Sequence, residues 1–180
     1  GRLSVVDAMF TATSATCVTG LIVRDTWTQF SYFGQAVILV LIQVGGLGLV
    51  TLTSFFALAM RRRMGFRDLR LLGESVSADG YDQAKSVLKI VVGLAAMFEG
   101  IGVLLLLFAF VPQFGLEGIW VSVFTAISAF CNAGFDLFGR FGQYSSLVPY
   151  VSNYYVQAVV MFMIIAGGLG FMVWVEIGQF

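Results

Sequence analysis

The sequence predicts an all-α membrane protein that contains an internal repeat of parallel, pseudo-symmetric units. Three observations predict this fold: the composition, a set of long uncharged runs, and a polar segment that occurs twice. The chain of 180 residues is 59% hydrophobic and 11% charged, and its mean hydropathy is +0.93. Soluble domains are about 45–50% apolar and about 25% charged, so this chain has too few charges to cover a soluble surface.

Three apolar runs predict three membrane-crossing helices. Residues 32–60 contain no charge, and a helix of that length spans about 43 Å, more than a bilayer core of about 30 Å. The second run, 90–111, carries only Glu99 and is expected to end at Pro112. The third run, 154–175, is uncharged. A soluble domain of this size would have to bury three helices of such length, so the sequence favours a membrane protein over a soluble one.

Basic residues orient these helices. Seven of the ten Lys and Arg residues lie within residues 61–89, so the positive-inside rule places this connection in the cytoplasm. Residues 1–31 and 112–153 then lie on the outer side of a multi-pass protein of the plasma (inner) membrane. The connection is either a docking surface for a cytosolic partner or a solvated topological anchor, and the second interpretation is favoured.

The polar segment that occurs twice is "FTATSATCVTG" at residues 10–20 and "FTAISAFCNAG" at residues 124–134, and seven of the eleven positions match. A second block, "GGLG", occurs at residues 45–48 and again at 167–170. Transporters commonly contain such repeats. Because two crossings separate the copies, the repeats are expected to be parallel rather than inverted.

Each copy is expected to enter the membrane as a short helix and to return as an extended strand that ends in glycine. Non-helical backbone at membrane depth survives only where it lines a watery cavity or is buried in protein. Carbonyl groups from such a strand can replace the hydration shell of a monovalent cation. A filter for divalent ions would favour carboxylates, and residues 16–20 and 130–134 contain none.

The motifs "TATSATCVTGL", "GQAVILVLIQVGGLG", "SAFCNAGFDLF" and the second "GGLGF" are distributed along nearly the whole chain, from residue 11 to residue 171. In these motifs the chain resembles the Trk/Ktr/HKT superfamily of potassium transporters, and most closely the bacterial Ktr-type potassium-translocating subunit. The resemblance implies four helix–pore-loop–helix units around one pore. About two of them are present: residues 1–60 form the first, whose outer helix is expected upstream, and residues 90–180 form the second.

The resemblance also assigns the site. Gly20 and Gly134 match the family's filter glycines, and the neighbouring carbonyls that would bind K⁺ come from a short set of residues: Val18, Thr19, Asn132 and Ala133. The implied activity is potassium uptake through this filter, either passive or coupled to Na⁺. The implied partners are the lipid bilayer, a second copy in a homodimer, and a cytosolic nucleotide-binding (RCK-type) regulatory subunit.

Several residues leave alternatives open. Asp136 either raises the cation concentration at an outer vestibule or satisfies loop amides in a turn. Glu99 is expected to have a structural role, and Gln43 is expected to bond across helices. The GGLG blocks are expected to allow close helix packing or a mild bend. Arg24 and Asp25 are expected on the surface of the outer loop.

Other functions are less well supported. The chain has no His, no paired carboxylates or Ser/Lys dyad is expected at membrane depth, and an enzyme is therefore not expected. The net charge is zero, so nucleic acid is not an expected partner, and no cofactor is expected beyond the transported K⁺ and Na⁺. Another re-entrant-loop channel and a non-conducting membrane assembly domain remain as alternatives.

Overall fold

The computed structural model describes residues 3–61, 79–170, 173 and 174, and the side chains of residues 49–88 lie outside this description. Every regular element in the described part is a helix: α1 (Val5–Thr16), α2 (Thr26–Gln29), α3 (Tyr32–Arg61), α5 (Asp79–Phe114), α6 (Glu117–Phe130), η1 (Phe138–Arg140), η2 (Val148–Tyr150) and α7 (Tyr154–Gly168). The all-α expectation is confirmed for these residues.

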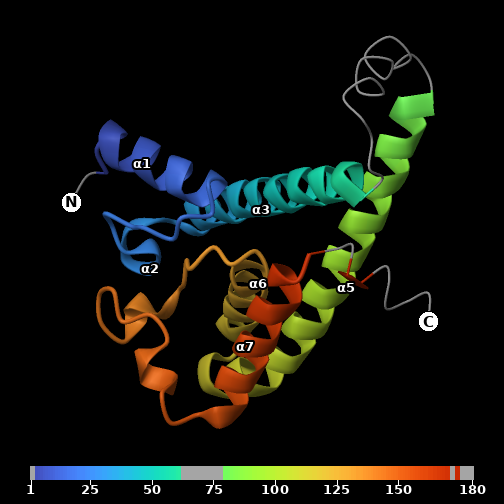
Figure 1. The fold of residues 1–180 in the computed structure, drawn as a ribbon. Coiled ribbons are helices and arrows are strands. Elements are labelled where there is room, and N and C mark those ends of the chain that lie inside the picture. The colour runs from blue at the N-terminus through green and yellow to red at the C-terminus, as the bar shows by residue number, and fades with distance from the viewer. Residues whose placement is uncertain (1–2, 62–78, 171–172, 175–180) are drawn as a thin grey trace.

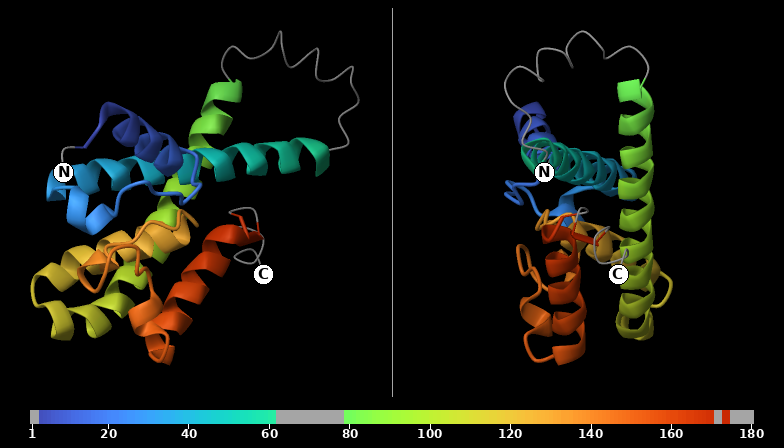
Figure 2. Two further views of the ribbon diagram at one scale, coloured as in Figure 1. Left: turned by 90° about the vertical axis from the view of Figure 1, so that its left-hand side faces the viewer. Right: turned by 45° about the vertical axis from the view of Figure 1, so that its right-hand side comes forward.

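The helices form two groups that meet near the middle of the molecule. In the first group, α1 lies against the N-terminal half of α3. In the second group, the three helices α5, α6 and α7 all contact one another. Figure 2 shows that α3 runs across α5 rather than alongside it, and α3 contacts both α5 and α6 there. The two polar segments lie where the groups meet.

Side-chain caps fix where two of these helices begin. Ser4 precedes α1, and its Oγ accepts a hydrogen bond of 3.0 Å from the backbone N–H of Asp7. Asn153 precedes α7, and its Oδ1 accepts a hydrogen bond of 3.2 Å from the N–H of Val156. These oxygens satisfy N–H groups that have no partner inside the helix. The starts of α1 and α7 are therefore encoded locally.

Helices occur at all three predicted crossings. The stretch Lys89–Phe114 of α5 is long and apolar enough to cross a membrane, and it is the one such stretch within the residues that the structure describes. Shorter apolar stretches are Tyr32–Gly48 of α3 and Tyr154–Gly168 of α7. Residues 62–78, most of the predicted cytoplasmic connection, lie outside the described residues.

Two of the predicted helix ends are wrong. The second helix continues through Pro112 to Phe114, because a proline in the last turn removes only one hydrogen bond, and it ends where Gly115 adopts a φ of +60°. The third helix stops at Gly168 instead of 175. The indole N–H of Trp174 donates to the carbonyl of Ala166 at 2.9 Å, replacing the bond that a continuing helix would make.

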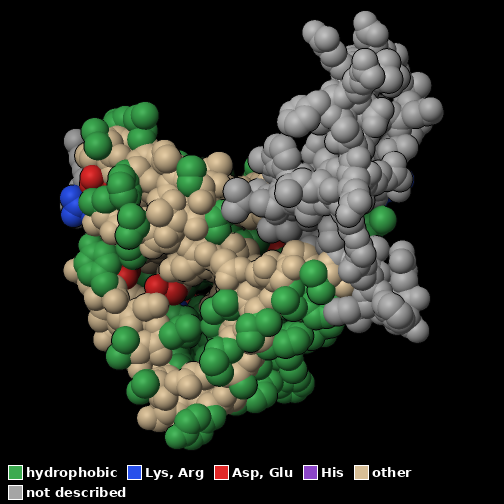
Figure 3. Space-filling model, in the orientation of Figure 1, with side chains coloured by type: hydrophobic (Ala, Val, Ile, Leu, Met, Phe, Trp, Pro, Cys, Tyr) green, Lys and Arg blue, Asp and Glu red, His purple; other side chains and the backbone are tan. Residues whose placement is uncertain are grey.

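Hydrophobic side chains are exposed on the helices that the sequence assigns to the membrane. They include Leu104 and Phe108 of α5, which are 61% and 76% exposed, and Ile165 of α7, which is 61% exposed. Figure 3 shows hydrophobic side chains over much of this face and few charged ones among the described residues. Such a surface suits lipid better than water, because monomeric soluble proteins rarely expose large apolar patches.

Candidate selectivity-filter site

The first polar segment leaves α1 through a turn in which a β-branched residue has a positive φ. Val18 adopts a φ of +55°. The N–H of Thr19 donates to the carbonyl of Ser14 at 2.9 Å, and the N–H of Val18 donates to the carbonyl of Ala15 at 3.2 Å. This pair of bonds is the Schellman motif that ends many helices, although glycine usually occupies the positive-φ position.

The second polar segment leaves α6 through the same turn. Asn132 adopts a φ of +57°. The N–H of Ala133 donates to the carbonyl of Ser128 at 2.8 Å, and the N–H of Asn132 donates to the carbonyl of Ala129 at 3.1 Å. The two segments therefore share their backbone geometry as well as their residues. The prediction of a short helix is confirmed in both, but a plain extended return is wrong, because each chain first turns sharply.

Gly20 and Gly134 lie side by side, although 114 positions separate them. Their φ values are +78° and +73°. A Cβ added to Gly20 would lie 2.7 Å from the carbonyl oxygen of Ala133, and a Cβ added to Gly134 would lie 3.4 Å from the Cα of Gly20. Both the backbone conformation and the close approach therefore favour glycine here. The structure brings together the two glycines that the sequence singled out.

Each polar segment is held from behind by a GGLG block. A Cβ on Gly45 of α3 would overlap the carbonyl oxygen of Thr16, at the end of α1. A Cβ on Gly167 of α7 would overlap the carbonyl oxygen of Phe130, at the end of α6. The expectation of close helix packing is confirmed at these two positions, where the glycines let one helix press on the backbone that leads into the turn.

Side chains add further support to the second segment. The Nδ2 of Asn132 donates to the carbonyls of Phe130 and Ile164, each at 3.4 Å. The hydroxyl of Ser128 donates to the carbonyl of Phe135. A cavity of about 190 Å³ adjoins this segment, and Asn132, Gly134 and Asp136 are among its lining residues. The corresponding Ser14 Oγ in the first segment is buried and has no hydrogen-bond partner among the residues that the structure describes.

Asp136 makes the turn contact that one of its two interpretations predicted. Its Oδ1 accepts a hydrogen bond of 2.9 Å from the N–H of Phe138. Burial raises the pKa of Asp136 above its usual range, and this hydrogen bond opposes the shift. The carboxylate also lines the cavity beside Gly134. The turn interpretation is confirmed, and the vestibule role stays a prediction.

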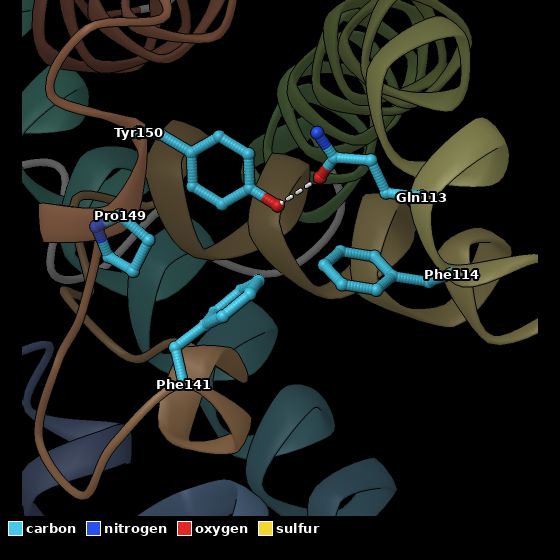
Figure 4. A pocket seen from close by; sticks show the side chains of 5 residues that line it. All are labelled: Gln113, Phe114, Phe141, Pro149 and Tyr150. Atoms are coloured by element: carbon cyan, nitrogen blue, oxygen red, sulfur yellow. Dashed lines mark hydrogen bonds between the residues drawn. The ribbon is translucent and has the colours of Figure 1, made fainter.

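A larger cavity, of about 350 Å³, lies away from both polar segments. Gln113, Phe114, Phe141, Pro149 and Tyr150 line it, and the hydroxyl of Tyr150 donates to Gln113 Oε1 at 2.6 Å (Figure 4). None of the residues predicted for the filter takes part in it. Within the described residues, no group of three or more His, Cys, Asp or Glu side chains could hold a metal ion.

The sequence missed the role of Asp25, which was expected on the surface. Its side chain is buried at 3% exposure. One carboxylate oxygen accepts from the N–H of Thr28 at 2.9 Å and the other from the N–H of Tyr144 at 3.1 Å. Asp25 therefore caps α2 and ties the first outer loop to the second. The cap was readable from "DTWT", but the second contact spans 119 residues and left no local pattern.

Comparisons with known proteins agree with this geometry. The model of the TrkH family, described as cation transport protein, matches residues 2–178. The chain is 39% identical over 173 residues to the potassium/sodium uptake protein NtpJ of Enterococcus hirae, covering 96% of this chain and 37% of that protein. It is 41% identical over 172 residues to the Ktr system potassium uptake protein B of Bacillus subtilis, covering 95% and 38%.

A third relative is the Ktr system potassium uptake protein B of Vibrio alginolyticus, which is 37% identical over 172 residues and of which the chain covers 37%. The chain thus spans just over a third of the length of the curated relatives it matches. These relatives are transport proteins and not enzymes, as the sequence predicted. Because the family model spans almost every residue, the chain belongs to the TrkH family of cation transport proteins.

Proposed function

We propose that this chain is part of a potassium-uptake protein of the plasma membrane, and that its two polar segments line the selectivity filter. One observation carries the proposal: two segments of matching geometry meet at Gly20 and Gly134. Relatives named as potassium uptake proteins support K⁺ as the transported ion. The carbonyls of Val18, Thr19 and Gly20 and of Asn132, Ala133 and Gly134 would replace the water around a dehydrated K⁺.

The proposed architecture is a ring of helix–pore-loop–helix units related by parallel pseudo-symmetry. In it, residues 1–60 supply the pore loop and inner helix of one unit, and residues 90–180 supply a second unit. Residues 61–89 form the cytoplasmic connection. Four segments are needed to surround an ion, so the two described here would form half of the filter. The matching contacts of Gly45 on α1 and Gly167 on α6 support this arrangement.

The wider proposal concerns ions and partners. Asp136 would attract cations to the outer vestibule, since it lines the cavity beside Gly134. The whole protein would form a homodimer that binds a cytosolic nucleotide-binding (RCK-type) subunit. Because one relative is named a potassium/sodium uptake protein, Na⁺ is the ion to test as a coupled or activating partner.

The test is Rb⁺ and Na⁺ uptake by the full-length protein in proteoliposomes, with Gly20→Ser and Gly134→Ser as variants. We expect both to lower the preference for Rb⁺ over Na⁺. Gly20→Ser should have the larger effect, because a Cβ there lies 2.7 Å from the Ala133 oxygen. Gly115→Ser is the matched control, since Gly115 has a φ of +60° with nothing within 4 Å of its added Cβ.

If Gly20→Ser and Gly134→Ser both kept the wild-type preference for Rb⁺ over Na⁺, the assignment of these residues to the filter would be wrong. Water or solute flux without Rb⁺ flux in the wild-type protein would instead favour another re-entrant-loop channel. No flux of any kind would favour a non-conducting assembly domain.

A further inference from the structure

Gln43 lies where three helices meet behind the second polar segment. It is on α3, and its Nε2 donates a hydrogen bond of 2.8 Å to Glu99 Oε1 on α5. Its Oε1 accepts from the thiol of Cys131, with 3.8 Å between sulfur and oxygen. Cys131 is the C-cap of α6 and directly precedes Asn132. The amide group of Gln43 therefore links α3 of the first group to α5 of the second. It also links both helices to Cys131, where the turn after α6 begins.

Packing against α3 also fixes the position of Cys131 beside Gln43. A Cβ on Gly46, one turn further along α3, would lie 2.7 Å from the Cys131 sulfur. On the other side, Phe98 precedes Glu99 and stacks on Phe130, with ring centroids 5.9 Å apart. The thiol of Cys131 thus packs against α3, while the ring of the preceding residue, Phe130, packs against α5. Cys17, at the matching place in the first segment, is exposed.

The chemistry of the three groups favours an amide between the other two. A carboxylate oxygen accepts, a thiol donates, and glutamine is a side chain that can donate to the first and accept from the second at once. Buried polar groups need such partners, because a buried donor or acceptor that makes no hydrogen bond keeps the full cost of its desolvation. Glu99 is only 9% exposed, so its bond to Gln43 compensates for its burial.

We propose that Gln43 is a positioning residue for the second filter segment. It holds Cys131, and through it the carbonyls of Asn132 to Gly134, at a fixed distance from α5 and α3. This inference rests on the proposed function, since it concerns how that filter is held. It adds that the second segment is held by a residue of the other unit: Gln43 follows the first polar segment in the chain but supports the second.

The experiment uses the full-length protein and two readouts. The first is the preference for Rb⁺ over Na⁺ in proteoliposomes. The second is the rate at which a membrane-permeant maleimide labels Cys131 in a background where it is the sole cysteine. Gln43→Leu keeps the volume and removes both bonds. We expect labelling to become at least threefold faster and the Rb⁺ preference to fall about threefold, the size of one interhelical hydrogen bond in a membrane.

Gln35→Leu is the matched control. Gln35 is on the same helix, is 2% exposed, and also joins two groups, donating to the carbonyl of Phe30 at 3.1 Å and accepting from Trp120 Nε1 at 2.7 Å. Neither of these hydrogen-bond partners belongs to the second polar segment, residues 124–134. We expect neither readout to change by as much in this variant. Equal effects of Gln43→Leu and Gln35→Leu on both readouts would show that Gln43 is only a packing contact.

Glu99 gives a second test that does not depend on Gln43→Leu folding. In Glu99→Gln an amide oxygen still accepts from Gln43, so selectivity and labelling should stay near wild type. Glu99→Leu should behave like Gln43→Leu. If the Gln and Leu variants changed both readouts equally, the hydrogen bond would be irrelevant and the proposal overturned. If wild-type protein carried no Rb⁺, the proposed function would fail, and the labelling rates would still decide whether Gln43 positions Cys131.

Discussion

At the scale of single residues, Val18 holds a backbone conformation that its side chain disfavours. A φ of +55° is uncommon outside glycine and is a real outlier for a β-branched residue. A left-handed conformation costs roughly 1–2 kcal/mol. Such strain persists where surrounding bonds over-determine it, and here the bonds of Val18 and Thr19 to α1 do so. Asn132 tolerates the same φ more easily, so the strain is concentrated in the first segment.

Asp136→Asn separates the two roles of that residue. The amide oxygen can still accept from the N–H of Phe138, so the turn should be kept while the charge is lost. If Asp136 attracts cations, the KM for Rb⁺ uptake should rise about twofold at low ionic strength and less at about 0.15 M salt, where charges more than about 8 Å apart are screened. The measurement is initial Rb⁺ uptake at varied Rb⁺ and salt concentrations.

The pH dependence gives this prediction a second check. Because burial raises the pKa of Asp136, its carboxylate is protonated at a higher pH than an exposed Asp would be. The difference between wild type and Asp136→Asn should therefore be present near neutral pH and should shrink as the pH falls through that raised pKa. A KM that is the same in both proteins at low salt and neutral pH would leave Asp136 with its turn role alone.

At the scale of elements, α3 packs against the end of α1 in the same way that α7 packs against the end of α6. Each presents a GGLG glycine to the last residue of a helix, Gly45 to Thr16 and Gly167 to Phe130. Backbone then packs directly on backbone, with no side chain between them. This leaves little room for the following turn to shift, and the proposed filter would need such a fixed backbone.

Gly45→Ala should separate α3 from α1. The added Cβ would overlap the Thr16 oxygen, which is backbone and cannot move without the turn. We expect a loss of about 1–3 kcal/mol in the free energy of unfolding, the usual cost of overpacking, and a lower midpoint of thermal unfolding in detergent. Gly93→Ala on α5 is the control, because no neighbouring atom of the described residues lies within 4 Å of its added Cβ.

The control should show the opposite sign. Alanine in a helix interior is favoured over glycine by roughly 0.5–1 kcal/mol, so Gly93→Ala should unfold at the same or a higher temperature. If the thermal midpoint of Gly45→Ala were no lower than that of Gly93→Ala, the close contact of α3 with α1 would not contribute to stability in the whole protein.

The helices and the close glycine contacts could be predicted from the sequence because both depend on local patterns. Long uncharged runs indicate helices, and GGLG indicates close approach. The end of α7 could not be predicted, because it depends on Trp174 reaching back to the carbonyl of Ala166. The sequence predicted that Gly20 and Gly134 occupy matching positions, but it did not predict that they are in contact. The repeat relates the two glycines, but no local signal places them side by side.

At the scale of the whole molecule, side chains near the N-terminal ends of α3 and α6 join the two groups of helices. The guanidinium of Arg140 lies 4.1 Å from the ring centre of Trp27 and 4.3 Å from that of Phe114. It also pairs with Glu117 Oε2 at 2.8 Å, and Glu117 Oε1 accepts from the hydroxyl of Tyr32 at 3.2 Å. Trp27 lies on α2 and Tyr32 on α3, whereas Phe114, Glu117 and Arg140 lie on α5, α6 and η1. This cluster therefore links α2 and α3 to the second group and to η1.

Arg140→Lys should weaken this join even though it keeps the charge. A planar guanidinium stacks on two rings at once, and an ammonium group does not. Each cation–π contact is worth about 0.5–2 kcal/mol, whereas the pair with Glu117, whose side chain is 52% exposed, contributes little. We expect a loss of about 1–3 kcal/mol in the free energy of unfolding, measured as a lower thermal midpoint in detergent.

Arg24→Lys is the control for Arg140→Lys, since it also changes an arginine in an ion pair. Arg24 Nε donates to Asp7 Oδ2 at 3.0 Å, but the Arg24 side chain is 47% exposed, and the pair joins α1 only to the loop that precedes α2. It should change stability by less than about 0.5 kcal/mol. If the cluster keeps the filter segments in register, Arg140→Lys should also reduce the preference for Rb⁺ over Na⁺, although Arg140 lies outside the filter. Loss of stability with unchanged selectivity would show that the cluster holds the groups together without controlling the position of Gly20 against Gly134.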